Sequence, residues 1–442
     1  MTRATALAAA LALALAAAPL AAQPRLQLIS HAYDNPNASI NAYYPELSAD
    51  GQWVSFSSTA SGFVAPGADG FIGADVFVYD VFCRRTEVAS LTWDGKAPNE
   101  ASGGSMGRSS ISGDGRYVAF ASRASNLVYG DNDSNGHTDV FLLDRHRPVG
   151  DPKRIRRVSA ARTAGSNGPS DQPSLSADGR YLAFQSAANN LVPNDTSGTN
   201  VFVYDLQADT LALVSRDRDG KPAEGQYPRI DAQGRHLAFR SGALNLIAED
   251  IVWSTTPHVY LRDLDAGRNQ LVDRRSDGLI PSQGATDVDA ISGDGRYVSF
   301  RSSAADLTGS TSPLTPQIFV RDTVAGTLEM ITINPGNAPT PYQSRWSALD
   351  HDGRHVAFSS PSQGQWSPAG LYRRDRSNGA TELLSPGYQD GSPQDSSYAS
   401  ISADGLRTAF VSGYGRLIAG VNAPAIFLAD LRVSVPPRYC PR

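Results

Sequence analysis

Short runs of alternating apolar and polar residues recur along the whole chain, each interrupted by an Asp-Gly pair or a close variant of it. The clearest copy is PSLSADGRYLAF at 173–184. Gly takes positive φ without steric cost and Asp can hydrogen-bond its own backbone, so each copy predicts a β-hairpin. The seven hairpin glycines are Gly51, Gly115, Gly179, Gly234, Gly295, Gly353 and Gly405.

Two further apolar runs follow most hairpins. The third run has the type DVFVYD and ends at Asp80, Asp144, Asp205, Asp263, Asp322, Asp375 and Asp430. A fourth run, such as LALVS at 211–215, closes most units. No stretch after residue 23 keeps a 3.6-residue apolar period, so helices are not expected. Four strands in each of seven units predict an all-β protein, a seven-bladed β-propeller with four-stranded antiparallel blades.

The two ends of the chain complement each other. The seventh unit reaches AIFLAD and then runs into Pro436 and Pro437, which a central strand would reject, so its fourth strand is missing. The sequence LQLIS at 26–30 looks like the fourth-strand run at 211–215. We therefore expect the N-terminal strand to complete the last blade, which closes the ring and leaves no open sheet edge.

In these repeats the sequence resembles the TolB-like propellers built from WD40-like PD40 repeats. The resemblance rests on the PSLSADGRYLAF hairpin and on the continuation NLVPNDTSGTNVFVYD at 190–205, and it covers nearly all of residues 23–442. It implies the propeller fold. TolB has six repeats and a preceding α/β domain, whereas this chain has seven repeats and no such segment, so TolB's role in the cell envelope and its partners are not carried over.

The first 22 residues differ from the rest. Arg3 precedes an Ala/Leu run from 4 to 20, and Leu20-Ala21-Ala22 offers the small residues that a signal peptidase needs. We expect a cleaved signal peptide at 1–22, a propeller at 23–442, and a periplasmic or secreted protein without a membrane span in its mature chain. A membrane anchor is the alternative, which Pro19 disfavours.

The charge composition restricts the classes of macromolecule that this protein is expected to bind. Asp and Glu number 44 against 39 Lys and Arg, for a net charge of −5. Because no basic stripe is available to neutralise a phosphate backbone, nucleic acid is not expected as a partner.

The chain has two cysteines, Cys83 after the third strand of the first unit and Cys440 in the C-terminal tail. The first and last blades of a closed ring are neighbours, and disulfides persist in exported proteins. We expect a Cys83–Cys440 disulfide that clamps the closure, with two free thiols as the alternative.

One acidic loop matches the start of a calcium-binding loop. In the segment 131–139 oxygen ligands alternate, Gly136 is sixth, and the ligands would be Asp131, Asp133, Asn135 and Asp139. Position twelve is Leu142 where a bidentate Glu is expected, so a polar loop held by Asx turns is the alternative. Ca²⁺ is the one cofactor that the sequence suggests.

Other motifs are weaker. Gly103 to Gly107 matches the nucleophile elbow G-x-S-x-G, but a hairpin rather than a helix follows it. His236 and His355 stand where other units have Tyr, which favours a structural role over a transition-metal site. No catalytic residue is predicted.

A ring of candidate ligand-binding residues comes seven positions before each hairpin glycine, just ahead of the innermost strand. Its members are Tyr44, Arg108, Gln172, Tyr227, Val288, Trp346 and Tyr398. Trp93, Trp253 and Trp366 would surround it at larger radius. Aromatic rings beside Arg and Gln suit sugars or peptide side chains, although rings that merely fill the funnel are the alternative.

We therefore expect a platform that binds a protein, peptide or glycan at the channel mouth. The alternative functions are a polysaccharide-acting lyase or hydrolase with its site at the same mouth, and a structural part of a cell-envelope assembly. A fold alone does not separate these.

Overall fold

The computed structural model describes residues 23–442 except 71–72, 104–106, 132, 134, 161–165, 194–197, 250–255, 286, 309–314, 334–342, 362–368, 414–415, 422–423, 433–439 and 441–442. Its regular elements are 28 strands in seven four-stranded antiparallel sheets. Within the described residues no helix is present that could cross a membrane. The predicted seven-bladed, all-β propeller is confirmed.

Six blades are built from consecutive strands, ordered from the channel outward. Blade 1 contains β2 (Tyr43–Leu47), β3 (Trp53–Ser58), β4 (Asp75–Asp80) and β5 (Arg85–Val88). Blade 2 contains β6 (Ser109–Ile111), β7 (Tyr117–Ser122), β8 (Asp139–Asp144) and β9 (Ile155–Arg157). Blade 3 contains β10 (Ser170–Leu175), β11 (Tyr181–Ser186), β12 (Asn200–Asp205) and β13 (Thr210–Leu213).

Blades 4 to 6 repeat this order. Blade 4 contains β14 (Gln226–Ile230), β15 (His236–Ser241), β16 (His258–Asp263) and β17 (Arg268–Leu271). Blade 5 contains β18 (Asp287–Ile291), β19 (Tyr297–Ser302), β20 (Gln317–Asp322) and β21 (Leu328–Met330). Blade 6 contains β22 (Arg345–Leu349), β23 (His355–Pro361), β24 (Ala369–Asp375) and β25 (Ala380–Leu383).

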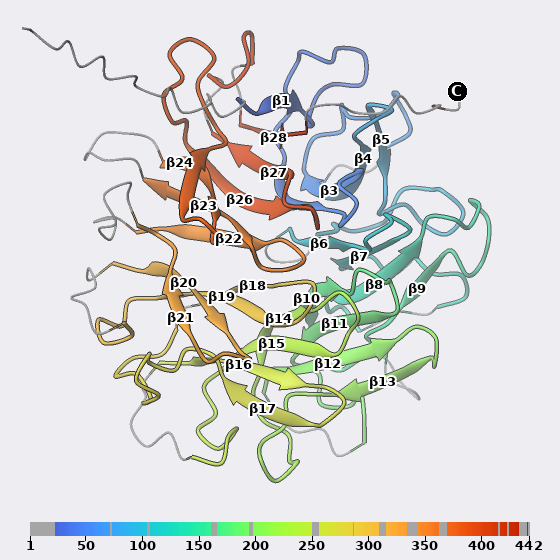
Figure 1. Ribbon diagram of the computed structural model, residues 1–442. Helices are drawn as coiled ribbons and strands as arrows, with labels where there is room; N and C mark the ends of the chain where they lie inside the picture. Colours follow the sequence, from blue (N-terminus) through green and yellow to red (C-terminus); the bar gives the residue numbers. More distant parts are fainter. Residues whose placement is uncertain are drawn as a thin grey trace, which may run out of the picture.

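Blade 7 is composed of both ends of the chain. It contains β26 (Ser396–Ile401), β27 (Arg407–Ser412) and β28 (Ala425–Asp430), and its outermost strand is β1 (Arg25–Leu28). β1 pairs with β28 from Arg25 opposite Asp430 to Leu28 opposite Phe427. Figure 1 shows the resulting ring, with β9, β13 and β17 at its periphery and β6, β10, β14 and β18 near its centre. The predicted closure by the N-terminal strand is confirmed.

Each blade carries one aromatic pair across its second and third strands. The ring centroids of the pairs lie 5.5 to 6.0 Å apart, and the rings are stacked or tilted. Such cross-strand pairs stabilise a sheet and fill the space between blades. The pairs are Phe56–Phe77, Phe120–Phe141, Phe184–Phe202, Phe239–Tyr260, Phe300–Phe319, Phe358–Tyr372 and Phe410–Phe427.

The hairpin glycines also join neighbouring blades. The first side chain of each second strand packs on the hairpin glycine of the next blade, so that a Cβ placed on Gly234 would lie 2.1 Å from Cδ2 of Tyr181. Glycine is needed for this approach as well as for its positive φ. The pairs are Trp53 on Gly115, Tyr117 on Gly179, Tyr181 on Gly234, His236 on Gly295, Tyr297 on Gly353, His355 on Gly405 and Arg407 on Gly51.

The Asp-Gly turns are linked into a ring around one end of the channel by backbone hydrogen bonds 2.8 to 3.2 Å long. The donor and acceptor pairs are Asp50 N to Gly113 O, Gly113 N to Ala177 O, Asp178 N to Ala232 O, Ala232 N to Gly293 O, Asp294 N to His351 O, His351 N to Ala403 O and Ala403 N to Ala49 O. These hydrogen bonds occupy backbone groups of the turns and hold neighbouring blades together, which indicates a structural role for the turns.

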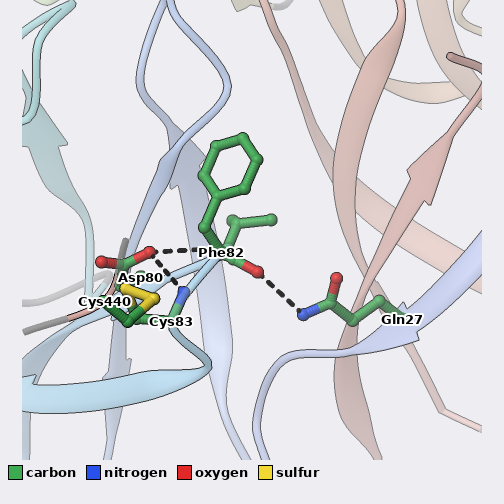
Figure 2. The surroundings of a disulfide bond; sticks show 6 residues. Gln27, Asp80, Phe82, Cys83 and Cys440 are labelled. Carbon is green, nitrogen blue, oxygen red and sulfur yellow. Dashed lines mark hydrogen bonds between the residues drawn. A yellow bond between two sulfur atoms is a disulfide. The ribbon is translucent and has the colours of Figure 1, made fainter. Parts of the chain in front are cut away.

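The expected Cys83–Cys440 disulfide is present, with the two Cα atoms 5.6 Å apart. Figure 2 shows it beside Asp80, whose carboxylate accepts hydrogen bonds from the backbone N–H groups of Phe82 and Cys83 at 2.9 Å. The side-chain amide of Gln27, in β1, donates a hydrogen bond to the backbone carbonyl of Val81 at 3.4 Å. Strand pairing of β1 with β28 therefore completes blade 7. A hydrogen bond from Gln27 and the disulfide from the C-terminal tail connect its two ends to blade 1.

Candidate functional site

The first strands of all seven blades line a central channel. A cavity of about 190 Å³ lies in it, and the side chains that matter most in its wall are Tyr44, Glu46, Arg108, Arg229, Trp346 and Tyr398. This volume is below the range of roughly 300–1,000 Å³ that is typical of pockets for drug-sized ligands. The cavity therefore admits one end, or one residue, of a larger ligand.

The predicted ring of residues lies at a break in the first strands. Tyr44, Gln172, Tyr227, Trp346 and Tyr398 have left-handed backbones with φ between 53° and 56°. The strand register shifts at each of these points. Such a conformation is costly for a residue other than glycine and is found mainly at turns, bulges and functional sites. The same unusual backbone is thus built five times around the mouth.

Three rings of the predicted set form a continuous arc across blades 6, 7 and 1. The Trp346 and Tyr398 ring centroids are 4.3 Å apart, and those of Tyr398 and Tyr44 are 4.6 Å apart. Arg108 of blade 2 reaches over this arc, with its guanidinium carbon 5.6 Å from the centre of the Trp346 ring. The structure therefore brings Tyr44, Arg108, Trp346 and Tyr398 together at the mouth.

The remaining predicted residues lie apart from the cavity. Gln172 and Val288 are 2% exposed. Tyr227 packs on the core between blades 4 and 5, and the guanidinium carbon of Arg240 lies 5.8 Å from its ring centre. Trp93 pairs with the exposed Tyr129, at a centroid distance of 4.8 Å. Trp253 and Trp366 lie outside the described residues.

Two charged residues that the sequence reasoning missed face the channel from opposite sides of the ring. Glu46 belongs to blade 1 and Arg229 to blade 4, and Glu46 forms no ion pair within the described part of the chain. Its side chain is exposed to the channel cavity, whose wall surrounds it with protein. This poor solvation raises the pKa of Glu46, against the opposing effect of Arg229 and Arg108. Desolvation and the neighbouring Arg108 lower the pKa of Arg229 to about 10.

A denser charged group lies next to Arg229 in blade 5. Arg301 contacts the carboxylates of both Asp287 and Asp289. Asp289 also accepts a hydrogen bond from the Ser347 hydroxyl at 2.9 Å. Burial raises the pKa of Asp287. The mouth thus has an aromatic side in blades 6, 7 and 1 and a charged side in blades 4 and 5.

A sequence signal for Glu46 and Arg229 exists five positions before each hairpin glycine. The other five blades carry small residues there, namely Ser110, Ser174, Ala290, Ala348 and Ser400. Three of these serine hydroxyls accept a hydrogen bond from a backbone N–H of the next blade. A Glu and an Arg at a position otherwise kept small indicate residues placed for a purpose other than packing.

The predicted calcium loop lies on blade 2, with Asp131, Asp133 and Asp139 close together. The guanidinium group of Arg157 lies among them, with N–O distances of 2.8, 2.8 and 3.1 Å. Asn135 donates to Asp139 at 3.0 Å. An arginine therefore supplies the positive charge that the sequence reasoning assigned to a cation, and no cluster of three or more metal-ligating side chains is found in the described residues. Calcium binding at this loop stays a prediction.

The two histidines at hairpin positions have structural partners. Nδ1 of His236 lies 2.9 Å from Asp231, and Nδ1 of His355 lies 2.6 Å from Asp350. In the other blades a Ser stands where these Asp residues stand, so each His comes with its own Asp. The G-x-S-x-G match lies largely outside the described residues, since 104–106 are not among them.

No protein-family model matches the sequence, and no curated protein matches it. Several solved structures match. Oligogalacturonate lyase from Vibrio parahaemolyticus is 12% identical, and the match covers 93% of this chain and 98% of that chain at a TM-score of 0.53. A puromycin-hydrolysing peptidase from Mycobacterium tuberculosis is 14% identical, with 89% of this chain and 52% of that chain covered at a TM-score of 0.51.

TolB from Acinetobacter baumannii is also similar, at 14% identity over 87% of this chain and 78% of that chain, with a TM-score of 0.41. The chain has the seven-bladed propeller fold that the repeats predicted. At these identities the likeness shows the fold alone.

Proposed function

We propose that this protein is an exported propeller that binds a ligand in the channel, and that the ligand presents an acidic or acceptor-rich end to Arg108 and Arg229. The observation that supports this proposal is how the side chain of Arg108 is placed and bonded. Its guanidinium group makes no hydrogen bond to any described residue, although it lies at the rim of a cavity and against Trp346. A planar group with five N–H donors is suited to carboxylates.

The neighbouring groups support the same preference. Arg229 uses Nε and Nη1 on the backbone carbonyls of Asp289 and Pro228. Its other terminal nitrogen is left for the channel. The Ser110, Ser174 and Ser400 hydroxyls accept hydrogen bonds, so their hydrogens remain available as donors. The cavity wall therefore offers donors from two arginines and three serines. A glycan or a peptide with carboxylates fits this wall better than a neutral one.

The export part of the proposal draws on the disulfide. Cys83 and Cys440 are bonded, and such bonds persist in oxidising compartments such as the periplasm or the cell exterior. The expected signal peptide lies outside the described residues.

Arrays of acidic and neutral oligosaccharides and peptides test the binding proposal. We expect retention of acidic members, a loss of at least tenfold in affinity in R108A, and no change in R123A, which removes an exposed arginine from the same face of the same blade. Equal binding by R108A and the unmodified protein contradicts the proposal.

A polysaccharide-acting enzyme is the second candidate, because Glu46 is a carboxylate with a raised pKa that faces the cavity. A carboxylate with a raised pKa that faces a cavity is a candidate general acid. Because an oligogalacturonate lyase has a similar fold, oligogalacturonate is one substrate to test. Product release that disappears in E46Q, with binding retained, would support this function, and binding without turnover would favour the platform.

A further inference from the structure

Blades 1 and 2 carry the same pair of carboxylates at the same repeat positions, but they neutralise it differently. Asp75 and Asp139 each begin a third strand, and Asp69 and Asp133 each stand six residues earlier. The surroundings of Asp75 and Asp139 can therefore be compared directly.

One oxygen of each buried aspartate has the same partner in the two blades. The Ser90 hydroxyl donates to Oδ1 of Asp75 at 2.6 Å, and the Ser159 hydroxyl donates to Oδ1 of Asp139 at 2.5 Å. Each serine also accepts a hydrogen bond from the backbone N–H that follows its aspartate, at 3.0 Å in blade 1 and 2.9 Å in blade 2. The frameworks that hold the two carboxylates are equivalent.

The second oxygen distinguishes the two sites. Oδ2 of Asp139 receives hydrogen bonds from Arg157 and Asn135. Arg157 also lies 2.8 Å from Asp133 and so bridges the pair. In blade 1 the residue two before the serine is Val88 instead of arginine, and the position of Asn135 is held by Phe71. No described residue donates to Oδ2 of Asp75, although Asp75 is only 1% exposed.

A buried carboxylate without a donor, beside a second carboxylate, needs a positive charge or a proton. Burial and the adjacent Asp69 raise the pKa of Asp75 to about 7. Oδ2 of Asp75 is thus poorly satisfied at neutral pH within the described part of the chain. In blade 2 the guanidinium group of Arg157 supplies the positive charge that neutralises the equivalent carboxylates.

We propose that the Asp69–Asp75 pair of blade 1 binds a hard divalent cation, Ca²⁺ in an extracellular setting, in the place that the Arg157 guanidinium takes in blade 2. Carboxylate oxygens are preferred Ca²⁺ ligands, and water completes the coordination. Because only two carboxylates bind the ion, we expect a Kd of roughly 10⁻⁴ to 10⁻³ M, the range known for extracellular calcium modules. This site is separate from the channel and does not depend on the proposed ligand.

Thermal unfolding and calorimetry with CaCl₂ test the site on the full mature protein. We expect 10 mM Ca²⁺ to raise Tm by a few degrees over EDTA, because a ligand that binds only the folded state stabilises it. The shift should vanish in D75N and in D69N, whose amides remove the paired negative charge. The matched variant of blade 2, D133N, should keep it.

Two results would overturn the proposal. One is the absence of heat and of a Tm shift up to 10 mM Ca²⁺, which would mean that a shared proton satisfies the pair. The other is a Ca²⁺ response that D75N and D69N retain and D133N loses, which would move the cation to blade 2. If D75N does not fold, D69N decides, since Asp69 is partly exposed and its replacement disturbs less of the core.

Discussion

Removing the disulfide should weaken the closure of the ring by an amount that the structure allows one to work out. Cys83 and Cys440 are 357 residues apart in sequence. The entropy that so long a loop removes from the unfolded chain corresponds to about 6 kcal/mol at 25 °C. With an unfolding entropy of about 2.1 cal/mol/K per residue over the propeller, a loss of this size lowers Tm by roughly 7 °C. This value is an upper bound, because measured disulfide contributions are usually smaller.

The double variant C83S/C440S, which leaves no unpaired thiol, measures this contribution. Calorimetric scans should show a lower Tm for the variant than for the unmodified protein under oxidising conditions. A reducing agent should lower the Tm of the unmodified protein alone. The reasoning is refuted if the variant is as stable as the unmodified protein, or if denatured, unreduced protein contains two titratable thiols.

Two further predictions concern the face that carries the Asp-Gly turns. G234A should reduce the free energy of unfolding by roughly 2–4 kcal/mol in denaturant titrations, because its Cβ would meet Tyr181 and its φ is +69°. G220A, which has φ +79° and no atom within 4 Å, should cost clearly less, and equal losses would contradict the packing argument. His236 is hydrogen-bonded to Asp231, and this raises its pKa. The pair therefore stabilises the fold fully below the ordinary histidine pKa of about 6.5, and the contribution is lost as pH rises through the folded value. The swap D231S/H236Y, which restores the usual Ser and Tyr of this repeat, should flatten the dependence of Tm on pH between 6 and 8, and an unchanged profile would count against the pair.

The fold could be predicted because its determinants are local. Each Asp-Gly hairpin is specified by residues adjacent in sequence, and repetition made seven weak signals into one strong one. The closure by β1 followed from the missing fourth strand of the seventh unit, and the disulfide followed from the neighbourhood of the first and last blades in a closed ring. The packing of Tyr181 on Gly234 was not predicted, because it joins residues of two blades that no short-range rule connects.

The site was predicted only in part, because a shared repeat position does not give every blade the same side-chain surroundings. Counting seven positions back found Tyr44 and Trp346 at the mouth, but the same count gave Gln172, which is buried. All three residues have the same left-handed backbone, so the difference depends on the neighbouring side chains of each blade. Glu46 and Arg229 were missed because they come together only when the ring closes, across the channel.

The central claim is that the cavity between Glu46 and Arg229 is the ligand site. A crystal structure of the protein soaked with the tightest-binding acidic oligosaccharide or peptide from the arrays tests it most directly. The account predicts electron density for the ligand inside the channel, with an acidic group within hydrogen-bond distance of the Arg108 guanidinium. Ligand density on an outer blade surface, with an unchanged channel, would contradict it.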